Sequence, residues 1–210
     1  MVHYKMTPPN MTCHNFQYEL GKCYEHTGQL KLCSSGFHCC KYPLQCIQYY
    51  PSNSRLFEVE IGDEYVTGEN KVVTNKIKLV REIVGEERDN LLSGTVTLDN
   101  GDQRWCKNGK LHRDDDLPAV VRSDGTKFWY KDGKQHRDGD LPAVECPGGT
   151  KEWWKDGKLH RDGDKPAVED TDGTKQWYKN GELHRDGDQP AVVEDTKGTK
   201  YWYKNGLKHR

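Results

Sequence analysis

The sequence has few hydrophobic residues and no long apolar run. Hydrophobic residues make up 33% of its 210 residues, and the mean hydropathy is -1.03. No apolar stretch approaches the roughly 20 residues of a membrane-spanning helix, and Met1–Lys5 lacks the apolar segment of a secretory signal peptide. We therefore expect no membrane span and no secretion by a signal peptide, and we expect the eight cysteines to be thiols in a reducing compartment.

An excess of charge of either sign is also absent. Residues 1–93 contain 10 basic and 11 acidic residues, and the remainder contains 22 of each. Binding to a nucleic-acid backbone needs a surplus of Lys and Arg, so we expect no nucleic-acid partner. Disorder is disfavoured as well, because six Trp and eleven Tyr are unusual in disordered chains.

What the sequence does contain is a tandem repeat. Trp, His and Gly recur every 24 residues, with one spacing of 25 in the last unit, as in the tryptophans Trp105, Trp129, Trp153, Trp177 and Trp202. The consensus reads P-A-V-x-x-D-G-T-K-x-W-Y-K-[ND]-G-K-L-H-R-D-G-D. This period predicts stacked identical units over residues 94–210, about five in number with the first and last partial.

Each repeat predicts two tight hairpins. Residues 132–133, Asp-Gly, are typical of a two-residue type I′ turn and would place Trp129 opposite His136. Residues 124–125, also Asp-Gly, would form a second such turn and place Val120 opposite Trp129. In the following repeats the equivalent turns would pair Val144 with Trp153 and Val168 with Trp177. In the last repeat, a turn at Lys197-Gly198 would pair Val193 with Trp202.

Three repeated sets of side chains are candidate binding sites in this region. The five tryptophans either stack a ligand, if they are exposed, or hold neighbouring units together, if they are buried. The His-Arg pairs bind phosphate or carboxylate, or else pack on the Trp with the Arg stem covering the neighbouring face. The Asp-Gly-Asp loops ligate Ca²⁺, or are turns in which Asp caps its own backbone. We favour the structural interpretation of each set; the pairs are His136-Arg137, His160-Arg161 and His184-Arg185, and the loops are 138–140, 162–164 and 186–188.

The N-terminal part follows another pattern. Segments 16–21, 56–62 and 71–80 alternate apolar and polar residues, which predicts half-buried strands. Segment 42–50 contains Pro43 at a plausible helix start. The predicted fold class is therefore a small α+β domain at 1–84, a linker at 85–93, and an all-β tandem-repeat sheet or solenoid at 94–210.

A metal site is one hypothesis for the cysteine-rich part of this domain. Cys33, His38, Cys39 and Cys40 include suitable zinc ligands. Cys39 and Cys40 would point to opposite faces of an extended chain, and no C-x-x-C pair with a distant partner pair exists. We expect no metal.

The repeats resemble the short MORN-like W-Y-K-x-G-K-x-H-R units of tailed-phage and giant-virus proteins. Residues 16–24, 32–39 and 43–50 resemble an uncharacterised phage domain with F-Q-Y-E-x-G-K-x-Y, G-F-H-x-C and P-L-x-x-x-x-Y-Y motifs. These resemblances imply a viral, phage-type accessory or virion-associated protein for interaction or structure. They imply a host or viral protein partner, no cofactor, and a location in the host cytoplasm or the virion.

The order of elements in residues 1–84 is also similar to small ADP-ribosyltransferase-like folds. That resemblance implies an NAD-dependent enzyme with the repeats as a targeting module. Its candidate catalytic residues are His14, Tyr18, His38 and Glu60, with Glu58 as the neighbouring alternative. The other interpretation is a non-enzymatic domain in which His38 is structural, and we favour it because a Glu on a strand is ordinary.

Overall fold

The computed structural model describes residues 2–13, 16–51, 53–195 and 198–209. The chain folds as two compact units: unit 1 comprises residues 1–100 and 106–110, and unit 2 comprises residues 101–105 and 111–210. Strands account for 41% of the chain and helices for 5%. The protein is therefore mostly β, and each unit is described by itself below.

Unit 1 is built on a four-stranded antiparallel sheet with the order β1-β6-β9-β4. Leu56 and Phe57 are neighbours in β6 and both are fully buried. Successive strand residues point to opposite faces, so this sheet is covered on both sides. Its strands are β1 (His3–Thr7), β6 (Arg55–Ile61), β9 (Lys76–Ile83) and β4 (Cys23–Glu25).

Smaller elements complete unit 1. A three-stranded antiparallel sheet has the order β5-β8-β7, and β2 pairs with β3. These strands are β5 (Phe37–Cys39), β8 (Val72–Thr74), β7 (Tyr65–Thr67), β2 (Thr12–Cys13) and β3 (Phe16–Gln17). Unit 1 also contains β10 (Gly94–Thr97), while β11 (Gln103–Lys107) and β12 (Lys110–Leu111) cross the boundary between the two units.

The helices are short. The helix expected within 42–50 is α1 (Pro43–Cys46), which begins with Pro43 where a missing N–H is tolerated. The segment expected to be a linker contains α2 (Gly85–Leu91). None of the helices in the described part of the chain has the length and apolar character to cross a membrane.

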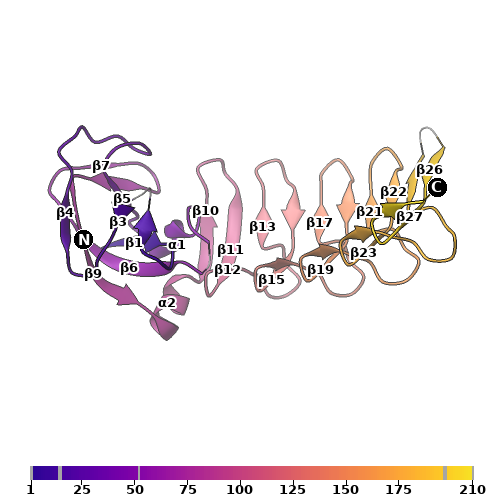
Figure 1. The fold of residues 1–210 in the computed structure, drawn as a ribbon, viewed down its shortest axis with the longest axis horizontal. Helices are drawn as coiled ribbons and strands as arrows, with labels where there is room; N and C mark the ends of the chain where they lie inside the picture. Colours follow the sequence, from indigo (N-terminus) through magenta and orange to yellow (C-terminus); the bar gives the residue numbers. More distant parts are fainter. Residues whose placement is uncertain (1, 14–15, 52, 196–197, 210) are drawn as a thin grey trace. The chain divides into compact units, whose positions relative to one another are not determined.

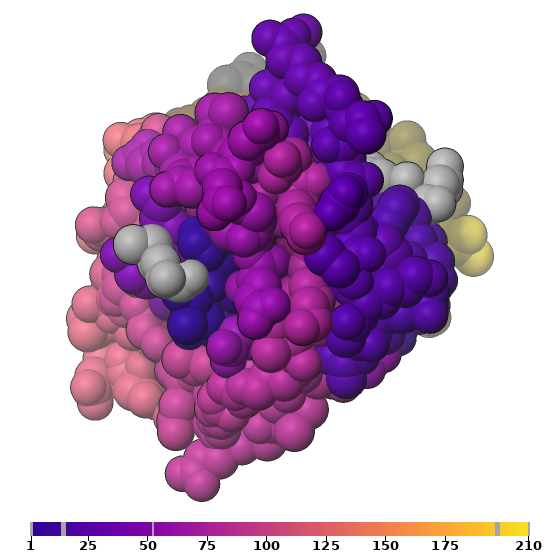
Figure 2. Space-filling model, turned by 90° about the vertical axis from the view of Figure 1, so that its left-hand side faces the viewer, coloured from indigo at the N-terminus to yellow at the C-terminus, as the bar shows by residue number. Residues whose placement is uncertain are grey.

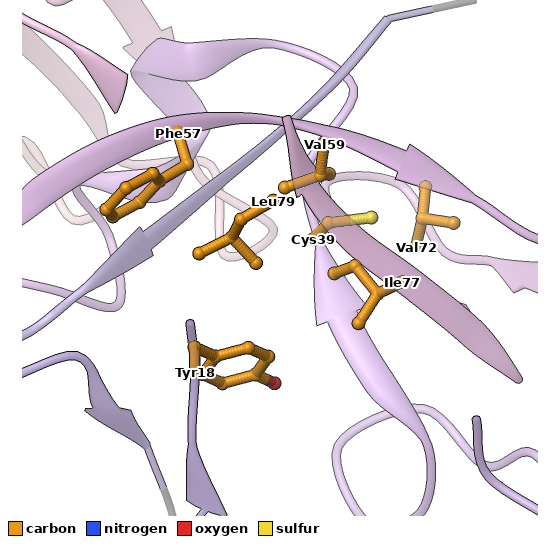
Figure 3. Close-up of a cluster of buried hydrophobic side chains, with 7 residues drawn as sticks. All are labelled: Tyr18, Cys39, Phe57, Val59, Val72, Ile77 and Leu79. Carbon is orange, nitrogen blue, oxygen red and sulfur yellow. The ribbon is translucent and has the colours of Figure 1, made fainter. Parts of the chain in front are cut away.

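Two apolar clusters hold unit 1 together. The first joins Tyr18 and Cys39 to residues of β6, β8 and β9, and Figure 3 shows Tyr18 and Leu79 among its members. The second joins Met6, Leu56 and Ile83 to the cysteines of the α1 region, Cys40 and Cys46. Cysteine therefore contributes to both clusters as a small apolar side chain.

Unit 2 is a row of similar hairpins that follow one another in sequence order (Figure 1). Its long antiparallel sheet runs in the order β11-β13-β14-β17-β18-β21-β22-β25-β26, and each repeat adds a separate two-stranded hairpin. The sheet strands are β13 (Val120–Val121), β14 (Lys127–Phe128), β17 (Val144–Glu145), β18 (Lys151–Glu152), β21 (Val168–Glu169), β22 (Lys175–Gln176), β25 (Val192–Glu194) and β26 (Thr199–Tyr201). The hairpins are β15 (Tyr130–Lys131) with β16 (Lys134–Gln135), β19 (Trp154–Lys155) with β20 (Lys158–Leu159), β23 (Tyr178–Lys179) with β24 (Glu182–Leu183), and β27 (Tyr203–Lys204) with β28 (Leu207–Lys208).

The first predicted turn is confirmed. Asp132 and Gly133 have φ values of 50° and 83°, and positive φ at both central residues defines a type I′ turn. Tyr130 pairs with Gln135, and the His136 N–H donates to the carbonyl of Trp129 at 3.1 Å. The other repeats have the same turn at Asn108-Gly109, Asp156-Gly157, Asn180-Gly181 and Asn205-Gly206.

The second predicted turn, at 124–125, is wrong. The Gly125 N–H donates to the Arg122 carbonyl, and the Arg122 N–H donates to the Thr126 carbonyl, each at 2.9 Å. The loop therefore has three residues, with only its last residue, Gly125, in the left-handed region at φ 87°. This extra loop residue moves the register by one.

The shifted register separates Val120 from Trp129. Val120 pairs with Phe128, and the Trp129 N–H donates to Ala143 of the next repeat at 2.9 Å. The predicted Val–Trp pairs of the following repeats are also wrong. Val144 pairs with Glu152 and Val168 with Gln176, one residue from the predicted partner, and Val193 pairs with Lys200, two residues from it. Lys197, one of the two residues of the predicted turn in the last repeat, lies outside the described residues.

Candidate functional sites: the unit 1 cavity and the unit 2 ladder

Unit 1 contains a cavity of about 500 Å³. Aromatic rings form much of its wall, and Tyr49 and Cys33 at its rim are exposed to solvent. On the face that Figure 2 shows, dark indigo early segments lie beside purple later ones. The cavity is thus assembled from segments far apart in sequence: β1, β2, β5, the α1 region and Lys71.

Two lysines line this cavity. The Lys5 residue is 3% exposed, and its Nζ donates to the carbonyl of His38 at 2.9 Å. Burial lowers the pKa of Lys5, because desolvation penalises the ammonium form. Lys71 lies nearer the rim, where its Nζ is 3.2 Å from Cys33 Sγ and 4.0 Å from the centroid of the Tyr49 ring.

Five cysteines also line the cavity: Cys13, Cys33, Cys39, Cys40 and Cys46. All eight cysteines of the chain are free thiols. A hydrogen bond from the Cys46 thiol holds the pKa of Cys40 below its ordinary value, whereas the same bond and burial raise the pKa of Cys46. Burial raises the pKa of Cys39 to about 12. Cys40 is therefore the more acidic thiol of the Cys40–Cys46 pair.

The structure brings together two of the predicted catalytic residues. Tyr18 and His38 both line the cavity, and burial raises the pKa of the Tyr18 phenol. The His38 ring accepts a hydrogen bond at Nε2 from the backbone N–H of Cys33 at 2.9 Å. Glu60 is exposed and lies 3.5 Å from Lys78 Nζ in an ion pair on the surface of the sheet. His14 lies outside the described residues.

The predicted zinc candidates have other contacts. Cys33 lies against Lys71 Nζ, and Cys39 is part of the first apolar cluster. In the described part of the chain, no three His, Cys, Asp or Glu side chains come together as metal ligands. A mononuclear metal centre therefore has no ligand set among these residues.

The repeated tryptophans of unit 2 are mostly buried. Trp129 and Trp153 are each 6% exposed and Trp177 is 8% exposed, whereas Trp105 and Trp202 at the ends of the array are half-buried. The indole Nε1 of Trp153 donates to the backbone carbonyl of Asp140 at 3.1 Å, and Trp129 makes the same bond to Asp116 at 2.9 Å. The faces of these rings are therefore inside the array.

An arginine from the same repeat covers each of four tryptophans. The Arg161 guanidinium carbon lies 3.7 Å from the Trp153 ring centroid, within the range of a cation–π contact. The same guanidinium donates to Asp140 of the preceding repeat at 2.7 Å and to Glu169 at 3.2 Å. Arg113, Arg137 and Arg185 stack on Trp105, Trp129 and Trp177 in the same way.

Each histidine joins its own loop to the next repeat. In His136, Nε2 lies 2.9 Å from Asp138, and Nδ1 accepts the backbone N–H of Asp156 at 3.2 Å. Nδ1 also lies 3.2 Å from the carboxylate of Asp156, so both ring nitrogens have polar partners, one in the loop of the same repeat and one in the next repeat. His112, His160 and His184 accept the equivalent N–H of Asp132, Asn180 and Asn205.

The Asp-Gly-Asp loops have contacts that differ from the expected capping of their own backbone. Asp138 lies 3.1 Å from Lys131 and 2.9 Å from His136 of its own repeat. Asp140 binds Arg161 and Lys165 of the next repeat, and these bonds lower its pKa to about 2. These side chains form a ladder, defined here as the repeated Trp, Arg, His and loop Asp residues, which connects one repeat to the next.

Sequence reasoning did not find Lys5 or the cavity. Four of the five residues of β1 are buried, so this strand lacks the alternation of buried and solvated residues that identifies a half-buried strand. The cysteines that surround the cavity span positions 13 to 46, and only the folded chain brings them together. Local sequence patterns contain no signal for such a site.

Comparison with known proteins finds a family match in the first part of the chain. Residues 1–88 match the model of a family described as a domain of unknown function (DUF7666). No curated protein and no solved structure matches the chain. The family match coincides with most of unit 1, the part that contains the cavity.

Proposed function

We propose that the chain is a viral, phage-type accessory or virion-associated interaction protein in which unit 2 binds a protein partner. We further propose that unit 2 belongs to the MORN-like repeats and that unit 1 is an α+β module. The W-Y-K-x-G-K-x-H-R pattern supports the first of these assignments, and α1, which packs against β1 of the four-stranded sheet, supports the second.

This proposal rests on one observation: the ladder side chains are engaged in contacts within the array. The repeated Trp, Arg and His side chains contact one another within and between repeats. A side chain engaged in this way stabilises the array and is a poor candidate for direct ligand contact. Recognition must therefore use the outward side chains that the array presents at a regular spacing.

A second row of aromatic side chains has the required properties. One half-buried aromatic residue follows each ladder Trp except Trp105, and the residues are Tyr130, Trp154, Tyr178 and Tyr203. Successive hairpins are joined by backbone hydrogen bonds, such as Gly157 N–H to the Gln135 carbonyl at 2.9 Å. Aromatic side chains with a polar tip are enriched at protein interfaces. We refer to these four residues as the outer aromatic row.

Affinity capture with the full chain tests this assignment. The Tyr130→Ala, Tyr178→Ala double variant should lose the proteins that the wild-type chain retains, with little change in thermal unfolding. The matched control is Lys127→Ala, Lys175→Ala, which changes exposed residues of the neighbouring strands. Proteins captured equally by the aromatic double variant and the wild type would exclude the outer aromatic row as the binding surface.

A further inference from the structure

Lys5 is a buried amine in an accessible cavity. Among the described residues it is the single Lys or Arg that is buried, at 3% exposure. Its neighbour Tyr4 fixes β1 against the cysteine-rich segment through hydrogen bonds of 2.8 and 2.7 Å with Cys40. The amine is therefore held by a strand with bonded neighbours on both sides, β6 and the Cys40 segment.

Burial of the amine disfavours its ammonium form. The contacts that would stabilise an ammonium come from uncharged groups: Lys5 Nζ lies 4.9 Å from the centroid of the Tyr18 ring and donates to the His38 carbonyl. Its other close ionisable neighbours are the thiols of Cys13, Cys39, Cys40 and Cys46. No Asp or Glu occurs among the described residues that line the cavity. An ammonium group here would have no carboxylate to offset its desolvation.

We propose that Lys5 is a reactive amine that forms a Schiff base with a small aldehyde or ketone bound in the unit 1 cavity. A neutral lysine amine is a nucleophile, and burial in an apolar pocket is one way in which proteins activate it. This inference is independent of the partner binding proposed for unit 2.

The reaction is balanced without an added oxidant or reductant. The Nζ lone pair attacks the carbonyl carbon, and one N–H proton passes to the carbonyl oxygen, which becomes the hydroxyl of a carbinolamine. A proton from the pair formed by Cys13 Sγ and the Tyr50 hydroxyl, which lie 3.1 Å apart and both line the cavity, lets that hydroxyl leave as water. The remaining N–H proton returns to this pair and leaves a neutral C=N bond to Lys5.

The cavity wall indicates the class of carbonyl compound. The rings of Phe16 and Phe37 are 5.4 Å apart in an edge-on arrangement, and both line the cavity with Tyr49. Such a wall favours a compound with an aromatic or apolar body. A volume of about 500 Å³ is sufficient for a small molecule of this kind.

Reductive trapping tests the proposal on the full chain. The protein is incubated at pH 7 with a limiting amount of benzaldehyde and sodium cyanoborohydride, and peptide mapping then locates the resulting benzyl-lysine. Burial lowers the pKa of Lys5, whereas bonds to Glu19 and Glu25 raise those of Lys22 and Lys76, so the neutral fraction is larger at Lys5. We expect Lys5 to be modified at least about tenfold faster than the exposed Lys22 and Lys76.

Two further measurements keep the result decisive. Lys5→Met should remove one modified site per chain and leave the labelling of Lys22 and Lys76 unchanged. If that variant does not fold, the map of the wild-type chain still decides. Modification of Lys5 no faster than that of Lys76 would overturn the proposal. Benzoate provides the second measurement. If benzoate stabilised the chain and benzaldehyde left Lys5 unmodified, Lys5 would be an anion-binding ammonium group, and the proposal would also be overturned.

Discussion

Unit 1 and unit 2 are both made mostly of antiparallel strands, but different interactions stabilise them. Unit 1 buries Phe57, Leu79 and Ile83 completely within two apolar clusters. In unit 2 the buried apolar side chains are a Trp, an Ala and a Val from each central repeat, and an Arg, a His and loop carboxylates connect the repeats. A sheet with little apolar area can therefore be held by contacts that recur with its period.

The largest expected effect comes from removing a central tryptophan of the ladder. Trp153→Ala should destabilise unit 2 by about 3–5 kcal/mol, because truncating a buried Trp leaves a cavity. Trp202→Ala should cost less than half as much, since Trp202 is half-buried in the last repeat. Denaturant unfolding of the full chain, with hydrogen exchange to separate the units, measures both. Equal losses of unfolding free energy would show that a central Trp contributes no more to the stability of unit 2 than a terminal one.

Loss of one arginine should have a smaller effect that is still specific to the ladder. Arg161→Met removes the contact with the Trp153 ring and the bonds to Asp140 and Glu169, and it should cost about 1–3 kcal/mol. The matched control is Lys155→Met, because Lys155 pairs with Asp162 at 2.9 Å but is 52% exposed. The control should change the unfolding free energy by less than about 1 kcal/mol. Similar losses for the two variants would show that the ring contact adds nothing.

Acid should weaken unit 2 through the loop carboxylates. Bonds to Arg lower the pKa of Asp116, Asp140 and Asp164, in the case of Asp140 to about 2. A carboxyl whose pKa is lower in the folded than in the unfolded state stabilises the fold above its unfolded pKa near 4, and this contribution is lost as pH falls through the folded value. Each exposed pair contributes at most about 1 kcal/mol.

A pH series of thermal melts between about 5 and 2 measures this loss. Asp140→Asn should flatten the dependence, because an amide does not titrate in this range. An unchanged slope in that variant would assign the acid sensitivity to other carboxylates. Glu82 and Glu87 in unit 1, whose pKa values are also lowered by Arg partners, are the first to examine in that case.

The same comparison shows what the sequence could predict. Asp132-Gly133 predicts its turn because both positions require positive φ, which is a local property. Asp124-Gly125 fits two kinds of turn, and the choice between them depends on how Trp129 pairs with Ala143 of the next repeat. The Lys5 environment depends on tertiary packing of segments up to Lys71. Unit 2 was therefore predicted to within one residue of register in its central repeats and two in its last, whereas the cavity of unit 1 was missed.

The smallest expected effect is a gain in stability at one irregular repeat. In the three-residue loops, Asp124 Oδ1 accepts the Thr126 N–H at 2.8 Å, and Asp172 accepts the Thr174 N–H at 2.9 Å. The equivalent position in the repeat between them is Gly148, which does not have a positive φ and whose added Cβ would meet only Thr171 at 3.9 Å. Gly148→Asp should therefore supply the missing bond to Thr150 and restrict the unfolded chain, stabilising unit 2 by about 0.5–1 kcal/mol.

The neighbouring glycine provides the matched control for this change. Gly149 has a φ of 106°, and a Cβ there would approach Thr171 to 3.3 Å, so Gly149→Ala should destabilise by about 1–2 kcal/mol. Thermal unfolding of the two variants gives shifts of opposite sign if the loop is as described. A destabilising Gly148→Asp would instead mean that this repeat uses its two glycines for a contact that the other repeats do not make.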